Sequence, residues 1–456
     1  MNCRVFVVLI GAGIAVVSLW PRSVPWAGAV SLAAPYPPLN QDARPALIRT
    51  SQLPELTGYQ SPKPVVAADG DGNVVVVAQG NANNQLRSDM LVWRSVDRGE
   101  SWEPPKNLTE KTSEGELCFD PWLETDGHGH YYFVHGFFPD GRPLIRRSKD
   151  AGKTWLDSLP IPWKSCDRPV LGISPDGKKL VVAGAMSERA PNSPTQPLNG
   201  DDPDLARKMR AMFRLSAGVF LSNNGGDTWV KWPSPFGDDE HAIPFAVVVD
   251  DSERVAASWI VEGNGSRSAV SLSGDLGRTW TTTTLVDPLQ PDRPHPFNGE
   301  RFPVLALDEG GSLHVAYVAA GGTGLMVRRS RDWKTWEVPF QLATSAAEEV
   351  RMAAIDGCGS MVHVTWLERI GKSWHAYYRG SRNFGDTWSA PCCLSQSIRQ
   401  SDSSISSGFQ IHSDDDQSSI RDDGCGRIHA VWCIRGGSIV HAVLDWSSKP
   451  GNAEIR

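Results

Sequence analysis

The chain has 456 residues, including 43 Gly, 33 Pro and 18 Trp, and its formal net charge is −7. An acidic balance without any basic block argues against a nucleic acid partner. The length suggests about three domains unless internal repeats extend a single one, and the many glycines and prolines are typical of an all-β protein with short strands.

The N-terminal segment predicts secretion. Residues 5–20 are almost wholly apolar, Arg4 precedes them, and Ala27-Gly28-Ala29 follows. This pattern is typical of a signal peptide over residues 1–29, and the apolar run is short for a membrane span, with an uncleaved N-terminal anchor as the alternative. We therefore expect a secreted or periplasmic protein with no other membrane contact, in which seven cysteines remain in an oxidising compartment.

After a Pro-rich lead-in (residues 30–53), a strand–turn–strand pattern recurs along the chain. Its first copy, residues 64–78, has an apolar run on each side of an Asp-Gly turn, which predicts a hairpin. Further copies lie at residues 121–134, 169–184, 244–259, 303–317, 352–366 and 420–432.

A second pattern, S-x-D-x-G-x-T-W, alternates with the hairpins. It stands at residues 148–155 and returns, with small changes, at 95–102, 222–229, 273–280 and 381–388, and one residue short at 330–336. The Asp or Asn can bond the backbone two residues on, Gly supplies a positive φ, and Trp restarts a strand. Each copy, here called a box, predicts a tight turn that serves the fold.

Together the two repeats predict four antiparallel strands per module, the pattern of a single β-propeller over residues 54–456. The seventh module has no box and lacks an outer strand, which residues 46–51 could supply. Seven blades are favoured, six are the alternative, and we expect a monomer.

The order of strands also predicts two different faces. Boxes and Asp-Gly turns should share one face, and the opposite face should carry the long insertions at residues 187–215, 285–300 and 394–419. The first insertion contains the one predicted helix, residues 203–214. Long loops on a rigid scaffold are where function usually resides.

Charged residues precede the first strand of most modules, nearest the axis on the loop-rich face. They are Lys63, Asp120, Asp167 with Arg168, His241, Glu300 with Arg301, and Glu349 with Arg351. Arginines and carboxylates crowded around one axis either pair with one another and plug the channel or bind a ligand. Because the guanidinium fork matches a carboxylate, the ligand would be acidic.

The boxes SKDAGKTW and SGDLGRTW resemble the Asp boxes of the sialidase-like (bacterial neuraminidase repeat) propeller superfamily, and the resemblance covers nearly all of the mature chain. In exo-sialidases three arginines clamp the sialic acid carboxylate, a Tyr activated by a Glu is the nucleophile, and an Asp is the acid/base. Two departures stand out, because Lys63 replaces the Arg of the family's Arg-Ile-Pro and seven hairpins replace six.

The resemblance implies a role for each charged position. The clamp would be Arg168, Arg301 and Arg351, with His241 and Lys63 as further substrate-binding residues. The catalytic residues would be Asp167 or Asp120 as acid/base, Glu300 as the activating carboxylate and Tyr317 as nucleophile, with Tyr377 and Tyr378 as the other candidates.

The expected function is therefore a glycoside hydrolase acting on terminal sialic acid or a related acidic sugar. The alternatives are a non-catalytic propeller that binds a glycan or a protein, and a uronic-acid polysaccharide lyase, in which Arg neutralises the carboxylate and Tyr or His is the base. We expect no cofactor and no metal, since the acidic stretches at residues 201–202 and 414–416 are weak Ca²⁺ candidates. The histidines that recur in second strands, His314, His363 and His429, are expected to be structural.

Two cysteines occupy matching places in neighbouring modules. Cys118 and Cys166 each stand three residues before the proline of a first strand, which predicts a disulfide that would stabilise the fold by about 4 kcal/mol. Cys358 and Cys425 match each other in Asp-Gly-Cys-Gly turns, and we expect these to be farther apart.

Overall fold

The computed structural model describes residues 45–61, 63–82, 87–109, 116–138, 141–189, 213–237, 240–262, 266–289, 302–371, 373–395, 418–434 and 438–446. Within these ranges the regular structure is β-strand and no α-helix occurs, so the all-β prediction is confirmed there. The same ranges hold no helix long and apolar enough to cross a membrane. The predicted signal peptide, nearly all of the predicted helix and both acidic stretches lie outside them.

The strands form four-stranded antiparallel meanders, here called units 1 to 7. Units 1 to 3 are β3 (Val65–Ala68), β4 (Val74–Ala82), β5 (Ser88–Ser95), β6 (Lys106–Asn107); β7 (Leu117–Thr125), β8 (Tyr131–Phe138), β9 (Arg142–Ser148), β10 (Leu159–Pro160); and β11 (Cys166–Ile173), β12 (Leu180–Arg189), β13 (Phe213–Ser222), β14 (Val230–Trp232). Units 4 and 5 are β15 (His241–Val249), β16 (Val255–Glu262), β17 (Ser266–Ser273), β18 (Thr281–Leu289); and β19 (Val304–Leu307), β20 (Leu313–Val318), β21 (Leu325–Ser330), β22 (Phe340–Gln341). Units 6 and 7 are β23 (Glu349–Cys358), β24 (Met361–Ile370), β25 (Ser373–Ser381), β26 (Cys392–Cys393); and β27 (Ser419–Asp422), β28 (Arg427–Ile434), β29 (Ser438–Asp445), β1 (Ala46–Gln52).

Two details modify this scheme. The short β2 (Tyr59–Gln60) adds to β4, and a single parallel contact between Ser88 and Leu117 joins units 1 and 2 into one nine-stranded sheet. The strand predicted in the lead-in is β1, which pairs antiparallel with β29 at the outer edge of unit 7.

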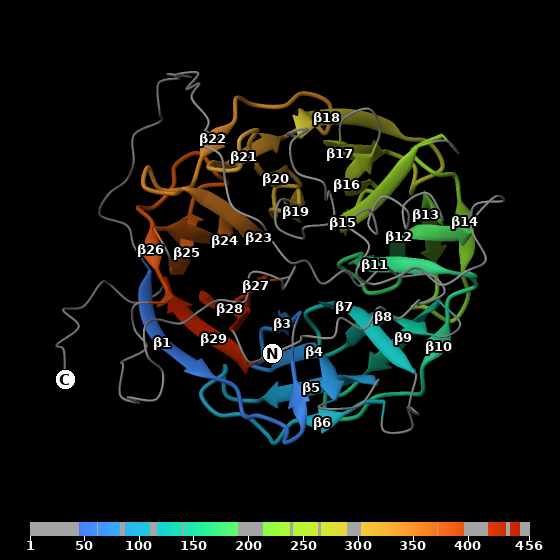
Figure 1. Cartoon of the computed structure of the whole chain (residues 1–456), viewed down its shortest axis with the longest axis horizontal. Coiled ribbons are helices and arrows are strands. Elements are labelled where there is room, and N and C mark those ends of the chain that lie inside the picture. Colours follow the sequence, from blue (N-terminus) through green and yellow to red (C-terminus); the bar gives the residue numbers. More distant parts are fainter. Residues whose placement is uncertain are drawn as a thin grey trace, which may run out of the picture.

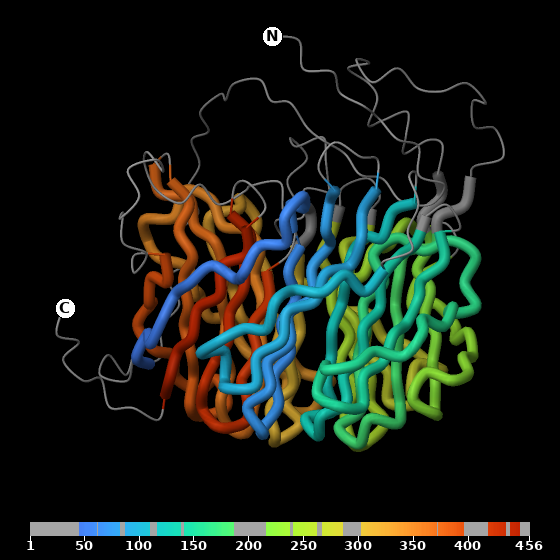
Figure 2. The backbone as a smooth tube through the Cα atoms, turned by 90° about the horizontal axis from the view of Figure 1, so that it is seen from below, coloured from blue at the N-terminus to red at the C-terminus, as the bar shows by residue number. Residues whose placement is uncertain are grey.

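The units lie around a common centre, with the first strand of each unit innermost, so the arrangement is propeller-like (Figure 1). The strands run between the two faces of the molecule (Figure 2). Apolar clusters fill the spaces between neighbouring units: Trp259 of unit 4, for example, packs with Val181 and Val219 of unit 3. Since second strands are covered on both faces, β4 begins with the unbroken apolar run Val-Val-Val-Val-Ala.

The boxes form the expected tight turns. In the first box the Asp97 carboxylate accepts hydrogen bonds from the Ser95 hydroxyl at 2.7 Å and from the Ser101 backbone N–H at 2.8 Å. In the second, the backbone N–H of Ala151 donates to the carbonyl of Gly129, in the Asp-Gly turn of the same unit, at 2.9 Å. Boxes and Asp-Gly turns therefore share one face, as predicted.

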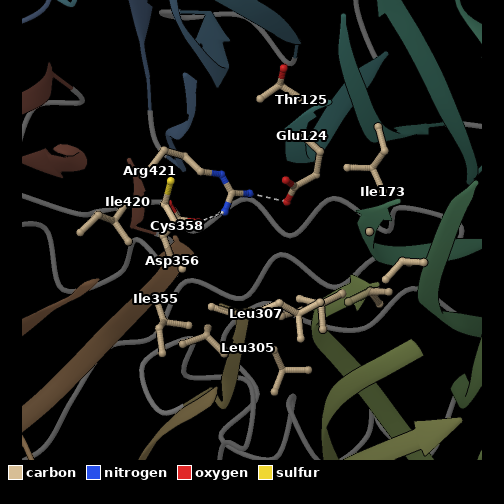
Figure 3. A pocket seen from close by; sticks show the side chains of 18 of the residues that line it. Glu124, Thr125, Ile173, Leu305, Leu307, Ile355, Asp356, Cys358, Ile420 and Arg421 are labelled. Carbon is tan, nitrogen blue, oxygen red and sulfur yellow. Dashed lines mark hydrogen bonds and ion pairs between the residues drawn. The ribbon is translucent and has the colours of Figure 1, made fainter. Parts of the chain in front are cut away.

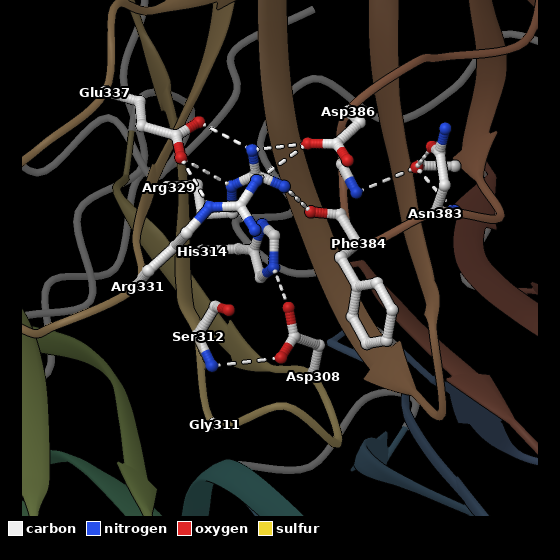
Figure 4. Close-up of polar contacts among 12 residues, drawn as sticks. Asp308, Gly311, Ser312, His314, Arg329, Arg331, Glu337, Asn383, Phe384 and Asp386 are labelled. Carbon is white, nitrogen blue, oxygen red and sulfur yellow. Dashed lines mark hydrogen bonds and ion pairs between the residues drawn. The ribbon is translucent and has the colours of Figure 1, made fainter.

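The box backbone has a feature that the sequence did not indicate. In four boxes the residue before Gly is also left-handed although it carries a side chain, with φ between 56° and 58°, as for Ala151 and Phe384. In the shortened box, which has no Gly, Trp333 holds the same conformation at 60°. An arginine of the preceding unit donates a hydrogen bond to the backbone carbonyl at this position. Arg94 donates to the carbonyl of Ala151 at 2.7 Å. Arg329 donates to the carbonyl of Phe384 and also to the Asp386 carboxylate, the latter at 2.6 Å (Figure 4). The strained turn thus anchors a contact between units.

The predicted disulfide is wrong, because Cys118 and Cys166 are both free and buried. Cys118 packs in the cluster between units 1 and 2, whereas Cys166 packs in the cluster between units 2 and 3. The body of unit 2 therefore separates the two thiols. Cys358 and Cys425 are also free, in agreement with the expectation that they lie farther apart. The Cys425 thiol lies 3.5 Å from the carbonyl of Gly70 in unit 1.

The histidines of the second strands have structural partners, as predicted. His314 lies 2.8 Å from the Asp308 carboxylate, and His363 lies between the Tyr378 hydroxyl at 2.7 Å and Asp422 at 3.0 Å (Figure 4 shows the first pair). Both histidines and Tyr378 are fully or almost fully buried, so each is part of the core.

Candidate functional site

Three of the charged positions that the sequence singled out have a left-handed backbone. The φ angles are 57° at Lys63, 50° at Asp120 and 52° at Arg168, and the uncharged Met352 shares this conformation at 50°. Asp120 and Arg168 stand in β-bulges, where the pairing of the inner strand with its neighbour shifts by one residue. Non-Gly residues rarely adopt this conformation, and they concentrate at functional sites when they do.

These residues form one charged cluster, here called the mouth cluster: Lys63, Asp120, Asp167 and Arg168. The Lys63 ammonium lies 2.5 Å from the Asp120 carboxylate. Burial alone would raise the pKa of Asp120, but the charges of Lys63 and Arg168 and hydrogen bonds from Lys63 and Asp167 lower it instead. Asp120 therefore remains an anion.

Asp167 behaves in the opposite way. Burial, followed by the negative charge of Asp120, raises the pKa of Asp167 to about 7 against the opposing effects of Arg168 and Lys63. Two carboxyls this close cannot both ionise readily, so they share one proton. Asp167 carries that proton near neutral pH and donates a hydrogen bond to Asp120.

The guanidinium of Arg168 rests against two phenylalanines. Its central carbon lies 5.0 Å from the ring centre of Phe245 and 4.8 Å from that of Phe302. Because the two rings are stacked with centres 3.4 Å apart and planes 12° apart, a point equidistant from both lies beside their common edge and not over either face. The contact is therefore apolar packing, without the electrostatic attraction of a cation over a ring face.

The mouth cluster opens onto a cavity along the axis. Asp120, Arg168, Phe245 and Phe302 are among the residues that line a volume of about 920 Å³, together with inner strands of all seven units and several Asp-Gly turns. A cavity of this size falls in the range of ligand-binding pockets.

A second charged group, which the sequence analysis missed, lies inside this cavity. Arg421 of β27 donates to Asp356 of β23 at 3.0 Å and to Glu124 of β7 at 2.5 Å (Figure 3). Burial raises the pKa of Glu124 despite the nearby Arg421 charge. Each of these three residues follows an aliphatic residue in its first strand, and the first strands of the other units have an apolar residue at the same position. The sequence therefore contained a sign of this charged group.

Arg351, predicted for the clamp, is engaged by a neighbour. Its guanidinium donates to the Glu349 carboxylate at 2.8 Å and lies 4.8 Å from the ring centre of Trp374, and both ionic partners are buried. Arg351 is not among the cavity-lining residues described, and its role in a clamp stays a prediction.

The three predicted tyrosines are not among the residues that line the described cavity. Tyr317 is buried in the apolar cluster between units 4 and 5, where burial raises its pKa. Burial likewise raises the pKa of Tyr377, to about 12, and this ring stacks on Trp366. The Tyr378 hydroxyl accepts a hydrogen bond from Trp446 at 2.7 Å inside the core.

Three further predicted residues, His241, Glu300 and Arg301, remain predictions. His241 begins β15, half-buried and opposite Glu262. Glu300 and Arg301 lie outside the described residues, so their roles stay predictions.

A tyrosine that the sequence analysis overlooked does contact a carboxylate. The Tyr59 hydroxyl donates to the buried Asp89 at 2.6 Å and accepts from Arg87 at 2.6 Å. Burial and the hydrogen bond to Asp89 raise the pKa of Tyr59. No repeat position marks this group, since Tyr59 belongs to β2, which has no counterpart among the strands described for the other units. Separately, in the ranges that the structure covers, no three His, Cys, Asp or Glu residues gather as metal ligands would.

Neither a protein-family model nor a curated protein matches this sequence. Among solved structures, a protein of unknown function from Dyadobacter fermentans is 15% identical, with a TM-score of 0.48 over 73% of this chain and 97% of that one. The Hadza microbial sialidase Hz136 is 12% identical, with a TM-score of 0.48 over 90% of this chain and 98% of that one. A PL25 ulvan lyase bound to -[GlcA(1-4)Rha3S]- is 11% identical, with a TM-score of 0.48 over 86% and 96%. Sialidases and a polysaccharide lyase are thus among the structures that this chain resembles, at a distance that assigns no activity.

Proposed function

We propose that the protein is a secreted glycan-processing enzyme that cleaves an acidic sugar at the mouth cluster, with a terminal sialic acid as the favoured substrate. The observation that carries this proposal is the carboxyl pair of Asp120 and Asp167 flanked by two cations. A carboxylic acid with a pKa near 7 is a proton donor suited to neutral pH. Lys63 and Arg168 supply positive charge for the carboxylate of the sugar.

In this proposal Asp167 protonates the glycosidic oxygen as the bond to the sugar breaks, and the leaving group departs as an alcohol. A water molecule adds to the anomeric carbon and gives its proton to the Asp167 carboxylate, which releases the free sugar and restores the acid. Asp120 stays ionised and orients the Asp167 proton through their hydrogen bond. Arg301 and Glu300 complete the acidic-sugar site in the proposal, on the strength of the sequence resemblance alone.

Turnover measurements on defined substrates test the proposal. Wild type should release free sugar from a fluorogenic sialoside, and Asp167→Asn and Arg168→Met should each lower kcat/KM by about a hundredfold or more. Arg142→Met, which changes an exposed arginine of β9, is the matched control and should leave kcat/KM unchanged.

The form of the product separates the alternatives. An unsaturated uronate from a uronic-acid polymer would identify a lyase instead of a hydrolase. Absence of turnover on both sialosides and uronic-acid polymers, with retained glycan binding, would contradict an enzyme and identify a binding propeller.

We also propose that the units close into a seven-bladed β-propeller. Apolar clusters occur at each boundary between neighbouring units, including that between units 7 and 1, where Val431 and Ile439 pack with Val66 and Trp93. The backbone N–H of Val66 in β3 donates to the Ser419 hydroxyl in β27 at 3.1 Å. Deleting residues 45–52 should lower the unfolding temperature of the whole protein in one transition, whereas unaltered stability would contradict ring closure by β1.

Secretion remains part of the proposal. N-terminal sequencing of the exported protein should begin near residue 30, and an intact N-terminus in the membrane fraction would identify an anchor instead.

A further inference from the structure

The second charged group in the cavity has a composition different from that of the mouth cluster. Trp122 and Glu124 come from β7, Asp356 from β23 and Arg421 from β27, strands that belong to units 2, 6 and 7. The Trp122 indole N–H donates to the Glu124 carboxylate at 2.9 Å. Arg421 bridges the two carboxylates, so all four side chains form one connected group.

The indole of Trp122 extends across the inner ends of several units. It packs against three separate apolar clusters, which lie between units 2 and 3, units 3 and 4, and units 4 and 5. Trp122 remains only half-buried and lines the cavity. An indole surface is therefore accessible beside the charged residues.

The opposite wall of the cavity is aliphatic. Leu305 and Leu307 lie across from Glu124 and Arg421, while Ile173 lies on the side of Glu124 and Ile355 next to Asp356 (Figure 3). The cavity thus offers a polar wall of planar side chains and an apolar wall. A sugar ring matches both, because its hydroxyl groups bond planar carboxylates and guanidinium while its C–H face packs on aromatic and aliphatic surfaces.

Two details show that the charged group faces open space. The side chains of Arg421, Glu124 and Asp356 keep 21%, 15% and 12% of their surface exposed. Both hydrogen bonds to Glu124 use Oε1, which leaves Oε2 to accept a hydrogen bond from a hydroxyl group of a ligand. With two carboxyl groups against one guanidinium, the group has no excess positive charge to attract an anionic sugar.

We propose that Trp122, Glu124, Asp356 and Arg421 form a carbohydrate-binding site in the axial cavity that takes a neutral sugar. This site is distinct from the mouth cluster in residues and in charge preference. It does not depend on the catalytic proposal, because binding is its only activity.

Saturation-transfer NMR with D-glucose, D-galactose and L-rhamnose at millimolar concentration tests the site. At least one of the three sugars should bind wild type, and an excess of free sialic acid should leave that signal in place. Glu124→Gln preserves shape but removes the charge, and it should weaken binding by about tenfold. Lys149→Gln, which changes an exposed box residue, should bind as wild type does.

The variants also separate binding from structural support. Trp122→Ala should abolish the signal, and if that variant fails to fold, Glu124→Gln still decides the matter. The proposal is overturned if none of the three sugars binds wild type, or if Glu124→Gln binds them unchanged. It is equally overturned if sialic acid displaces them, since the sugars would then occupy the mouth cluster.

Discussion

Replacing Asp167 by Asn is expected to stabilise the fold and to remove activity. The folded protein raises the pKa of Asp167 from 3.8 to about 7, so ionising this carboxyl at high pH costs the folded state about 1.4 kcal/mol for every pH unit between those two values. The whole interval corresponds to about 4 kcal/mol, and solvent around the half-buried side chain reduces this to roughly 2–4 kcal/mol. An Asn amide avoids the cost and can still donate a hydrogen bond to Asp120.

The sign of the effect gives the prediction a characteristic pH dependence. Below the unfolded pKa of 3.8 both states keep the proton, and the cost accumulates as the pH rises from there to about 7. The free energy of unfolding of Asp167→Asn should therefore exceed that of wild type at pH 8 and nearly equal it at pH 4. Urea unfolding at both pH values measures the difference, with the exposed Asp157→Asn as a control. A destabilised Asn variant at pH 8, or the same gain at both pH values, would refute the shared-proton reasoning.

Three further predictions concern stability and are checked by urea unfolding. Arg329→Ala should cost about 2–3 kcal/mol, because it removes buried bonds to the next unit; Arg331→Ala, with 56% of its side chain exposed, should cost less than about 1 kcal/mol. Burial lowers the pKa of His135 to about 4, so the folded state disfavours its protonation. The contribution of neutral His135 to the free energy of unfolding is present above pH 6.5, and about 3 kcal/mol of it is lost as the pH falls to 4. His135→Leu should make the free energy of unfolding depend less on pH in this interval. Gly99→Ala should cost about 3 kcal/mol, because φ is 75° and a Cβ would lie 2.6 Å from a side chain, whereas Gly58→Ala, with φ of 90° and nothing within 4 Å, should cost only about 1 kcal/mol.

The repeats made the fold predictable, because each box and each hairpin encodes its own turn locally. The strand around residues 46–51 could be predicted since unit 7 visibly lacked a partner strand. The failed Cys118–Cys166 bridge shows the limit of this reasoning. Equivalent positions in a repeat do not imply contact when each side chain faces the gap on the same side of its own unit.

The candidate site was only partly predictable. The sequence pointed to Lys63, Asp120 and Arg168 because each stands where a first strand was predicted to begin, although Asp120 and Arg168 lie within β7 and β11. That Asp120 and Asp167 share a proton was not predictable, because it depends on burial and distance. Arg421 was missed because charges within a strand normally face solvent. Only the ring arrangement turns this position toward the axial cavity.

The left-handed backbone at the mouth cluster has a consequence for engineering. Lys63, Asp120 and Arg168 each hold a conformation in which Gly would be less strained by about 1 kcal/mol. Random mutagenesis selected only for heat resistance should therefore enrich Gly or Asn at these three positions and erase the charges there. A screen that tracks binding or turnover alongside melting temperature would keep them, so the same library should diverge at these codons according to the selection applied.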